Sequence, residues 1–171
     1  MKNLRWCDNP QVTKGDIGEK LVADYLKSQG FNLYKPDGDS AHIFDFIAFK
    51  DKDFKFAVEV KTKPAFAKYA QTGFDYRSYE TYRAQTKKLN MRVKIFFVDA
   101  QEKRIYGGFL DELEKPCDYQ GIAYPRICIT KTGDKIICFP TKTMEVFAEI
   151  DAETVKKLAD LDSSKYRRFY E

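Results

Sequence analysis

Residues 44–62, FDFIAFKDKDFKFAVEVKT, combine two apolar runs with charges placed inside them. The runs have the phenylalanine, valine and isoleucine content of β-strands, and the polar KDKD between them is typical of a turn. The segment nevertheless contains Asp45, Glu59 and Lys61. A charge within an apolar strand costs several kcal/mol unless it is paired, binds a metal or faces a wet cleft. The three charges therefore need a physical reason.

The alternation of side chains assigns these charges to the faces of a predicted hairpin, with strands at about 42–49 and 54–62. Glu59 and Lys61 project from the same side of the second strand, roughly 7 Å apart along it. Asp45 is the only acid of the first strand. Whether Asp45 shares the face of Glu59 depends on the register of the hairpin, which the sequence leaves open. Strict alternation groups the apolar residues of the first strand as Phe44, Phe46 and Ala48 on one face and Ile43, Ile47 and Phe49 on the other.

The segments around the hairpin predict a sheet flanked by helices. A helix from about 16 to 29 precedes the hairpin, with apolar residues at helical spacing and Gly30 as a stop signal. A helix at about 79–89 and an apolar strand at 93–99 follow the hairpin, and this order favours a parallel crossover. The remaining signals are a strand and turn at 103–113, a hairpin at 125–140 and a short helix at about 152–161.

The chain of 171 residues fits one domain with a full-sized core. Hydrophobic residues make up 43% of it, and no apolar run approaches the roughly 18 residues that a membrane helix needs. The N-terminus MKNLRWCDNP lacks the apolar region of a secretory signal, so we expect a soluble, cytoplasmic protein without membrane contact. Four cysteines without CxxC spacing predict reduced thiols, and a single histidine argues against chemistry that needs several imidazoles.

Basic residues are concentrated in the middle of the chain. Residues 51–100 contain 11 Lys or Arg against 6 Asp or Glu, whereas the net charge of the whole chain is +4. A local basic excess suits a polyanion such as nucleic acid. Charge runs are also common on ordinary solvated surfaces, so this excess supports a nucleic-acid partner only together with a site.

Asp45 and Glu59 on neighbouring strands, with Lys61 two positions further on, form a pattern suited to phosphodiester hydrolysis. Carboxylate oxygens are ligands for a hard cation such as Mg²⁺, which keeps several of its waters. Such a cation lowers the pKa of a water and polarises the phosphoryl oxygen, while an ammonium can orient the water and offset the developing charge. Glu19 lies on the sheet-facing edge of the first predicted helix, from which its carboxylate could reach the same cation.

With these parts in this order, the sequence resembles the PD-(D/E)XK nuclease superfamily, whose members include restriction endonucleases and Holliday junction resolvases. The matching parts cover about residues 15–99: an acid-bearing helix (GDIGEKLVADYLKSQGF), a strand with an acid (IFDFIAF), a strand ending in ExK (FAVEVKT), then a helix and an apolar strand. The proline of the superfamily's name is absent, since Phe44 precedes Asp45.

The resemblance implies an α/β protein with a three-layer α-β-α, restriction-endonuclease-like fold, in which a central mixed β-sheet is flanked by helices. It implies one nuclease-like domain over 1–171, with its core at about 15–99 and C-terminal strands and a helix at about 100–171. It also implies Mg²⁺-dependent cleavage of DNA, with Mn²⁺ as a substitute. The implied roles are metal ligands and catalytic acids at Asp45, Glu59 and Glu19, and a catalytic lysine at Lys61.

The helix after the hairpin supplies further candidates. Some members of the superfamily place a Gln, Lys or Tyr from this helix near the active site, and by that analogy Gln85 is a candidate catalytic residue and Tyr82 a candidate neighbour. Basic and aromatic residues interleaved on this helix would suit contact with phosphates and stacking on bases, although its tyrosines could instead pack on the sheet. The candidates for nucleic-acid binding are Lys63, Tyr76, Arg77, Tyr82, Arg83 and Lys87.

Three alternatives stay open. Glu59 and Lys61 could lie exposed on a half-polar strand, with Asp45 accepting backbone hydrogen bonds and Glu19 on the surface. The chain could be a non-catalytic nucleic-acid-binding or assembly module, since a fold alone does not determine function. A metal-independent RNA endonuclease is disfavoured by the near absence of histidine. The sequence also leaves open which nucleic-acid structure is cut, and whether the protein works as a homodimer.

Overall fold

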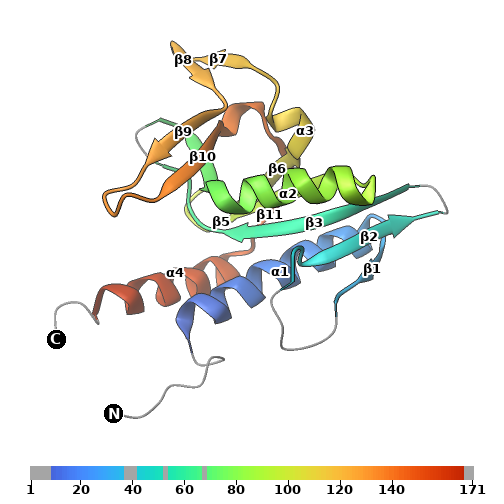
Figure 1. Ribbon diagram of the computed structural model, residues 1–171. Coiled ribbons are helices and arrows are strands. Elements are labelled where there is room, and N and C mark those ends of the chain that lie inside the picture. Colours follow the sequence, from blue (N-terminus) through green and yellow to red (C-terminus); the bar gives the residue numbers. More distant parts are fainter. Residues whose placement is uncertain (1–8, 37–41, 52–53, 67–68, 168–171) are drawn as a thin grey trace.

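The computed structural model describes residues 9–36, 42–51, 54–66 and 69–167. Its main feature is a six-stranded sheet with the order β1-β2-β3-β5-β6-β11, which Figure 1 shows crossing the middle of the molecule. Only β3 and β5 pair in parallel, and every other pair in this sheet is antiparallel. The strands are β1 (Asn32–Tyr34), β2 (Phe46–Lys50), β3 (Phe54–Thr62), β5 (Val93–Asp99), β6 (Arg104–Phe109) and β11 (Glu145–Glu149).

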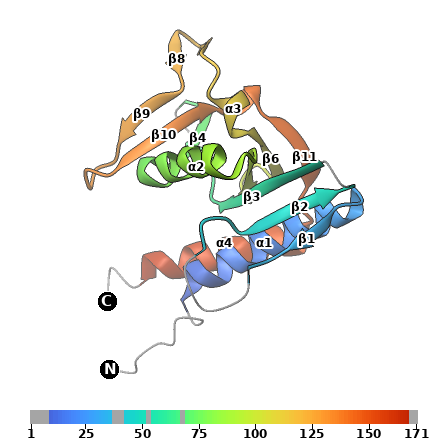
Figure 2. The same cartoon turned by 45° about the vertical axis from the view of Figure 1, so that its right-hand side comes forward.

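Two layers cover this sheet. Helices α1 (Pro10–Ser28) and α4 (Ala152–Arg167) lie on one face, and α2 (Tyr76–Leu89) lies on the other, together with α3 (Leu110–Leu113) and a second sheet (Figures 1 and 2). The second sheet has the order β4-β10-β9. Its strands are β4 (Gln71–Asp75), β9 (Arg126–Ile129) and β10 (Lys135–Pro140), and the remaining elements are the pair β7 (Cys117–Tyr119) and β8 (Ile122–Tyr124) and a 3₁₀ turn at Thr141–Thr143.

The predicted α/β fold with a central mixed sheet flanked by helices is confirmed, as is the parallel pairing of 54–62 with 93–99. The layer that contains α2 differs from the prediction because it includes a small sheet as well as helices. This sheet forms because β4 pairs with β10 across more than sixty residues of sequence, a long-range contact that local patterns do not reveal.

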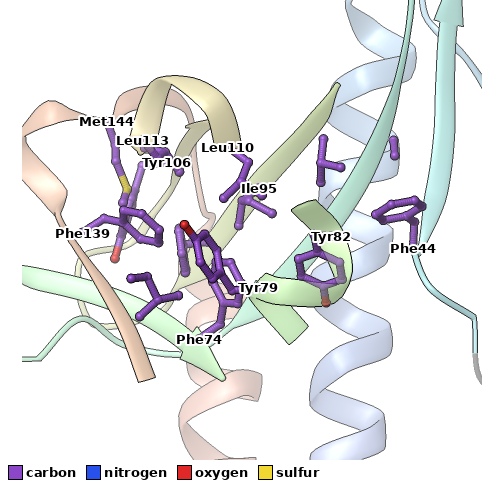
Figure 3. Close-up of a cluster of buried hydrophobic side chains, with 14 of the residues drawn as sticks. Phe44, Phe74, Tyr79, Tyr82, Ile95, Tyr106, Leu110, Leu113, Phe139 and Met144 are labelled. Carbon is purple, nitrogen blue, oxygen red and sulfur yellow. The ribbon is translucent and has the colours of Figure 1, made fainter. Parts of the chain in front are cut away.

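Side chains alternate along β3 and therefore belong to two separate cores. Phe56 and Val58 point toward α1 and α4, while Ala57 belongs to the cluster under α2. The α2-side cluster is rich in aromatic rings, and Figure 3 shows Tyr82 of α2 beside Phe44 within it. Because Glu59 and Lys61 follow Ala57 at intervals of two, they lie on the α2 side of the sheet.

Helix α1 packs directly against the end of β3. Gly18 makes this close approach, since a Cβ at that position would overlap Thr62 Oγ1. The helix starts earlier than predicted, at Pro10, because the Asn9 side chain caps it by accepting from Gln11 N at 3.0 Å. Its buried stripe is Lys14, Gly18, Val22 and Leu26.

Strand β2 also departs from the prediction, because it begins at Phe46 rather than near residue 42. The chain bends at Asp45, so Phe44 joins the α2-side cluster while Phe46 and Ala48 join the α1-side cluster. The predicted common face for these three residues is therefore wrong. Helix α2 begins at Tyr76 instead of residue 79, since Asp75 caps it by accepting from Arg77 N and Ser78 N.

The sequence also led to expectations about cysteines and membrane-spanning helices. The thiols of Cys117, Cys128 and Cys138 are free, as predicted, and Cys7 lies outside the described residues. None of the helices within the described ranges has both the length and the apolar character needed to cross a membrane.

Candidate active site

Asp45 lies near Glu59, close enough for the charge of Glu59 to raise the pKa of its carboxyl. The β2–β3 register ends at the pair of Phe46 with Val58, so Asp45 lies in the bend just before β2. Two hydrogen bonds hold Asp45 there: its backbone N–H donates to Val58 O at 3.0 Å, and its Oδ2 accepts from Val60 N at 2.7 Å. The bend before β2 thus brings the lone acid of the first strand to the acid of the second.

Glu59 is buried and shares one oxygen between two donors. Its Oε1 accepts from Lys61 Nζ at 2.6 Å and from the Tyr82 hydroxyl at 2.6 Å, and Lys61 Nζ lies 3.3 Å from the same hydroxyl. Only 6% of Glu59 and 4% of Tyr82 is exposed. The Tyr82 ring packs between Phe44 and Phe74, each with its centroid 5.7 Å away. Tyr82 is therefore placed to act through its hydroxyl on Glu59, while its ring face is covered.

The environment of Asp45 raises its proton affinity. Burial raises the pKa of Asp45 to about 7, with the charges of Glu59 and Glu19 acting in the same direction. The hydrogen bond from Val60 and the charge of Lys61 oppose this rise in the pKa. Burial and the nearby Glu59 also raise the pKa of the Tyr82 hydroxyl, which therefore stays protonated and donates. Negative charge at Asp45 is poorly compensated by the protein alone.

Glu19 on α1 lies close enough to Asp45 for its charge to raise the pKa of that carboxyl, and it has a partner that the sequence did not indicate. Lys35 Nζ lies 2.8 Å from Glu19 Oε2. The pKa of Lys35 is raised by its hydrogen bond to Glu19, and by the charges of Asp16 and Asp45 despite partial burial. Lys35 follows β1 directly, so the antiparallel β1–β2 pairing is what carries it to the acids.

Two further lysines lie beside Lys61. Lys63 donates from Nζ to Gly73 O at 2.6 Å, and burial together with the charges of Lys61 and Lys14 lowers its pKa, an effect that the charge of Cys138 opposes. Lys14 is only 6% exposed and lies on the buried stripe of α1. Its spacing of four from Gly18 was the signal that could have identified it from the sequence. At the end of β3, the Glu59 carboxylate is thus followed by the ammonium groups of Lys61 and Lys63, with Lys14 of α1 near Lys63.

The remaining candidates lie on α2, at different distances from this cluster. Gln85 is half-buried one turn after Tyr82, and within the described ranges no hydrogen bond ties it to the strand acids. Arg83 is paired with Glu114 at 3.2 Å and lies over the Tyr79 ring. Tyr76 is half-buried against the ring of Tyr79, whereas Arg77 and Lys87 are exposed.

The donor set suits a hard divalent cation held by few protein ligands. Within the described part of the chain, no group of three or more His, Cys, Asp or Glu side chains is arranged around a common point as a metal cage would be. Mg²⁺ nevertheless keeps several waters and is commonly bound through one or two carboxylates. Asp45 and Glu59 supply two neighbouring carboxylates, and the raised pKa of Asp45 marks a site where added positive charge is favourable.

Comparisons with known proteins add little to this geometry. No family model and no curated protein matches the chain. Among solved structures, the Holliday junction resolvase Hjc of the archaeal hyperthermophile Archaeoglobus fulgidus is similar over 72% of this chain and 87% of that one, with 14% sequence identity and a TM-score of 0.48. So distant a likeness says nothing of chemistry, and the site stands on its own contacts.

Proposed function

We propose that this chain is a Mg²⁺-dependent nuclease that hydrolyses phosphodiester bonds of DNA. The observation that carries the proposal is the grouping of Asp45, Glu59 and Lys61, in which Asp45 Oδ2 accepts from Val60 N and Lys61 Nζ lies 2.6 Å from a Glu59 oxygen. Two neighbouring carboxylates and one ammonium at the end of a strand suit metal-dependent hydrolysis of a phosphodiester.

Asp45 and Glu59 would hold the cation, with Glu19 contributing from α1 through water. When bound, Mg²⁺ or its substitute Mn²⁺ supplies a water of lowered pKa and polarises the phosphoryl oxygen. Asp45 keeps its Oδ2 oriented through Val60 N–H, and Tyr82 fixes Glu59 Oε1. These hydrogen bonds preorganise both carboxylates, so that the carboxylates need little rearrangement to accept a cation.

Lys61 acts on the reacting phosphate. Its ammonium lies at the boundary between the acids and the other lysines, where it can orient an attacking water and offset the negative charge that builds on the phosphorane. Lys63 and Lys14 extend this positive region along the end of β3. Exposed Arg77 and Lys87 on α2 are candidates for contacts with the DNA backbone. A single-site domain that cuts both strands of a duplex often works as a dimer, so a homodimer is part of the proposal.

A non-catalytic nucleic-acid-binding module is the second candidate, favoured by the saturation of Glu59 Oε1 by Lys61 and Tyr82. In such a module, Lys61 and Tyr82 would serve only to satisfy the hydrogen-bonding and charge requirements of the buried Glu59 carboxylate. A plasmid-nicking assay separates the two functions. Nicking that requires Mg²⁺ or Mn²⁺ and stops with EDTA supports the nuclease, whereas DNA binding without any nicking supports the module. Parallel assays on single-stranded DNA and on RNA identify the polymer.

Variants on β3 link any cleavage to this site. Lys61→Ala removes the ammonium and should lower the cleavage rate about 100-fold or more, the usual effect of deleting one charge-stabilising group. Lys55→Ala is the matched control, because Lys55 is an exposed lysine on the same strand and the same face. Equal loss of activity in both variants would mean that Lys61 has no special role.

A further inference from the structure

A cavity of about 430 Å³ opens where the loop after β3 meets strands β9 and β10. Its volume falls within the range of about 300 to 1,000 Å³ that is typical of sites for small organic groups. Its lining is mainly aromatic and apolar, with one guanidinium and one amide. The residues that define it are Phe66, Tyr69, Gln71, Arg126, Cys128 and Ile129.

The polar groups of this cavity are held in place. The Arg126 guanidinium lies over the rings of Tyr69 and Tyr124, 5.0 and 5.6 Å from their centroids. Arg126 Nε donates to Gln71 Oε1 at 3.1 Å, and the Tyr124 hydroxyl donates to the same oxygen at 2.9 Å. These two donors fix which end of the Gln71 amide is the oxygen and which is the nitrogen.

Among the described residues, Gln71 has few partners for the N–H groups of its amide. The residue is only 3% exposed, and the acceptor described for its Nε2 is Cys128 Sγ at 3.8 Å, a weak acceptor at a long distance. An amide nitrogen carries two N–H donors, and buried donors are normally satisfied. A ligand with a carbonyl or ring-nitrogen acceptor would complete this group.

Lys63 and Phe66 link the candidate active site to the cavity. Lys63, two residues after Lys61, has its Nζ 5.0 Å from the centroid of the Phe66 ring. Phe66 is fixed to β4 by the hydrogen bond from its N–H to Gln71 O at 2.7 Å. In both ribbon views, β3 ends on the side of the molecule where β9 and β10 lie (Figures 1 and 2). Lys61 at the acids, Lys63 beside Phe66 and Arg126 in the cavity lining therefore supply positive charge between the acids and the cavity.

We propose that this cavity binds one unpaired nucleobase of the nucleic acid whose backbone lies across Lys61 and Lys63, an inference that rests on the proposed nuclease function. Aromatic rings and a guanidinium stack on the face of any base. The Gln71 amide donates to an acceptor on the base edge. The substrate class is then DNA with an unpaired or displaced nucleotide next to the cleaved phosphodiester, rather than a continuous duplex.

Fluorescence anisotropy tests this proposal with the full chain and two labelled DNA duplexes, in Ca²⁺ in place of Mg²⁺. One duplex carries a single bulged adenine and the other an abasic bulge at the same position. Stacking of a base is worth enough that the adenine bulge should bind about 5- to 100-fold more tightly. Equal affinity for the two duplexes, or no binding to either, would overturn the proposal.

Variants locate the preference in the cavity. Tyr69→Ala and Arg126→Lys should each reduce the preference for adenine over the abasic bulge, and the second variant keeps the positive charge while removing the planar guanidinium. Ile127→Ala is the matched control, since Ile127 lies on β9 between two lining residues but is 51% exposed and does not line the cavity. An unchanged preference in both cavity variants, each with a wild-type unfolding transition, would contradict the assignment.

Cleavage of the same duplexes in Mg²⁺ separates this inference from the nuclease proposal. Cleavage without any preference for the adenine bulge would overturn the nucleobase cavity and leave the nuclease intact. A preference for the adenine bulge that depends on Tyr69, with no cleavage, would support the cavity and contradict the nuclease.

Discussion

The Tyr82 hydroxyl and Lys61 Nζ both donate to the same oxygen of Glu59, each at 2.6 Å. This shared acceptor joins α2 to the end of β3 through a buried charge. Removing the hydroxyl by Tyr82→Phe should lower the free energy of unfolding by about 1.5–3 kcal/mol, the usual contribution of a hydrogen bond to a charged group. Urea unfolding measures this change. Tyr34→Phe, at a tyrosine that is 57% exposed on the edge strand β1, is the control and should leave stability unchanged.

Asp45 should make the stability of the metal-free protein depend on pH. Its pKa rises from 3.8 to about 7 on folding, so the folded state binds the extra proton between these values and loses stability as the pH increases through that range. Asp45→Asn keeps an acceptor for Val60 N–H but cannot ionise. The variant should therefore be more stable than the wild type at pH 8, by on the order of 2–4 kcal/mol, and similar to it near pH 4.

Chemical denaturation at a series of pH values, in EDTA, checks this prediction. Asp24→Asn is the control, since Asp24 is an exposed acid on α1 paired with Lys20, and its pH profile should follow that of the wild type. Parallel profiles for the wild type and Asp45→Asn would show that the Asp45 carboxyl does not have the raised pKa.

The approach of α1 to β3 gives a prediction about packing. Gly18→Ala places a methyl group against Thr62 Oγ1, and overpacking of this kind costs roughly 1–3 kcal/mol. Gly15→Ala is the matched control on the same helix, because nothing lies within 4 Å of its added Cβ. That variant should gain about 0.5–1 kcal/mol from helix propensity. Thermal unfolding of the two variants should therefore shift in opposite directions, and a shift of equal sign would contradict the close contact.

Much of the site could be predicted from the sequence because alternation along a strand is a local property. Glu59 and Lys61 were expected on one face of β3, and they lie there. The sequence does not specify to which face of the sheet the Asp45 side chain points, because strand register is not a local property. The bend at Asp45 determines the position of this side chain. Because of the same bend, Phe44 does not share a face with Phe46 and Ala48 as the sequence predicts.

Contacts between distant segments were beyond prediction from periodicity. The ion pair of Glu19 with Lys35 depends on the short edge strand β1, which has only three residues and no clear pattern. The bond from Tyr82 to Glu59 joins residues 23 positions apart in different elements. The cavity at Gln71 exists because β4, which no local signal predicted, pairs with β10. Each of these features arises from tertiary packing, which a single sequence does not specify at short range.

Binding of Mn²⁺ should be separable from catalysis. Isothermal titration of the wild type with Mn²⁺ should show binding that weakens as the pH falls below about 7, because protons then compete with the cation for Asp45. Asp45→Ala should abolish this binding. Lys61→Ala should retain it while losing cleavage, and full activity in Lys61→Ala would contradict the role assigned to its ammonium.

The central claim is that Asp45 and Glu59 together hold one divalent cation at the end of β3. The most direct measurement is an anomalous difference map from crystals of this protein soaked with Mn²⁺ above pH 7. We expect a peak between the two carboxylates, with Lys61 Nζ beside it. A map without a peak at this position would contradict a cation site shared by Asp45 and Glu59.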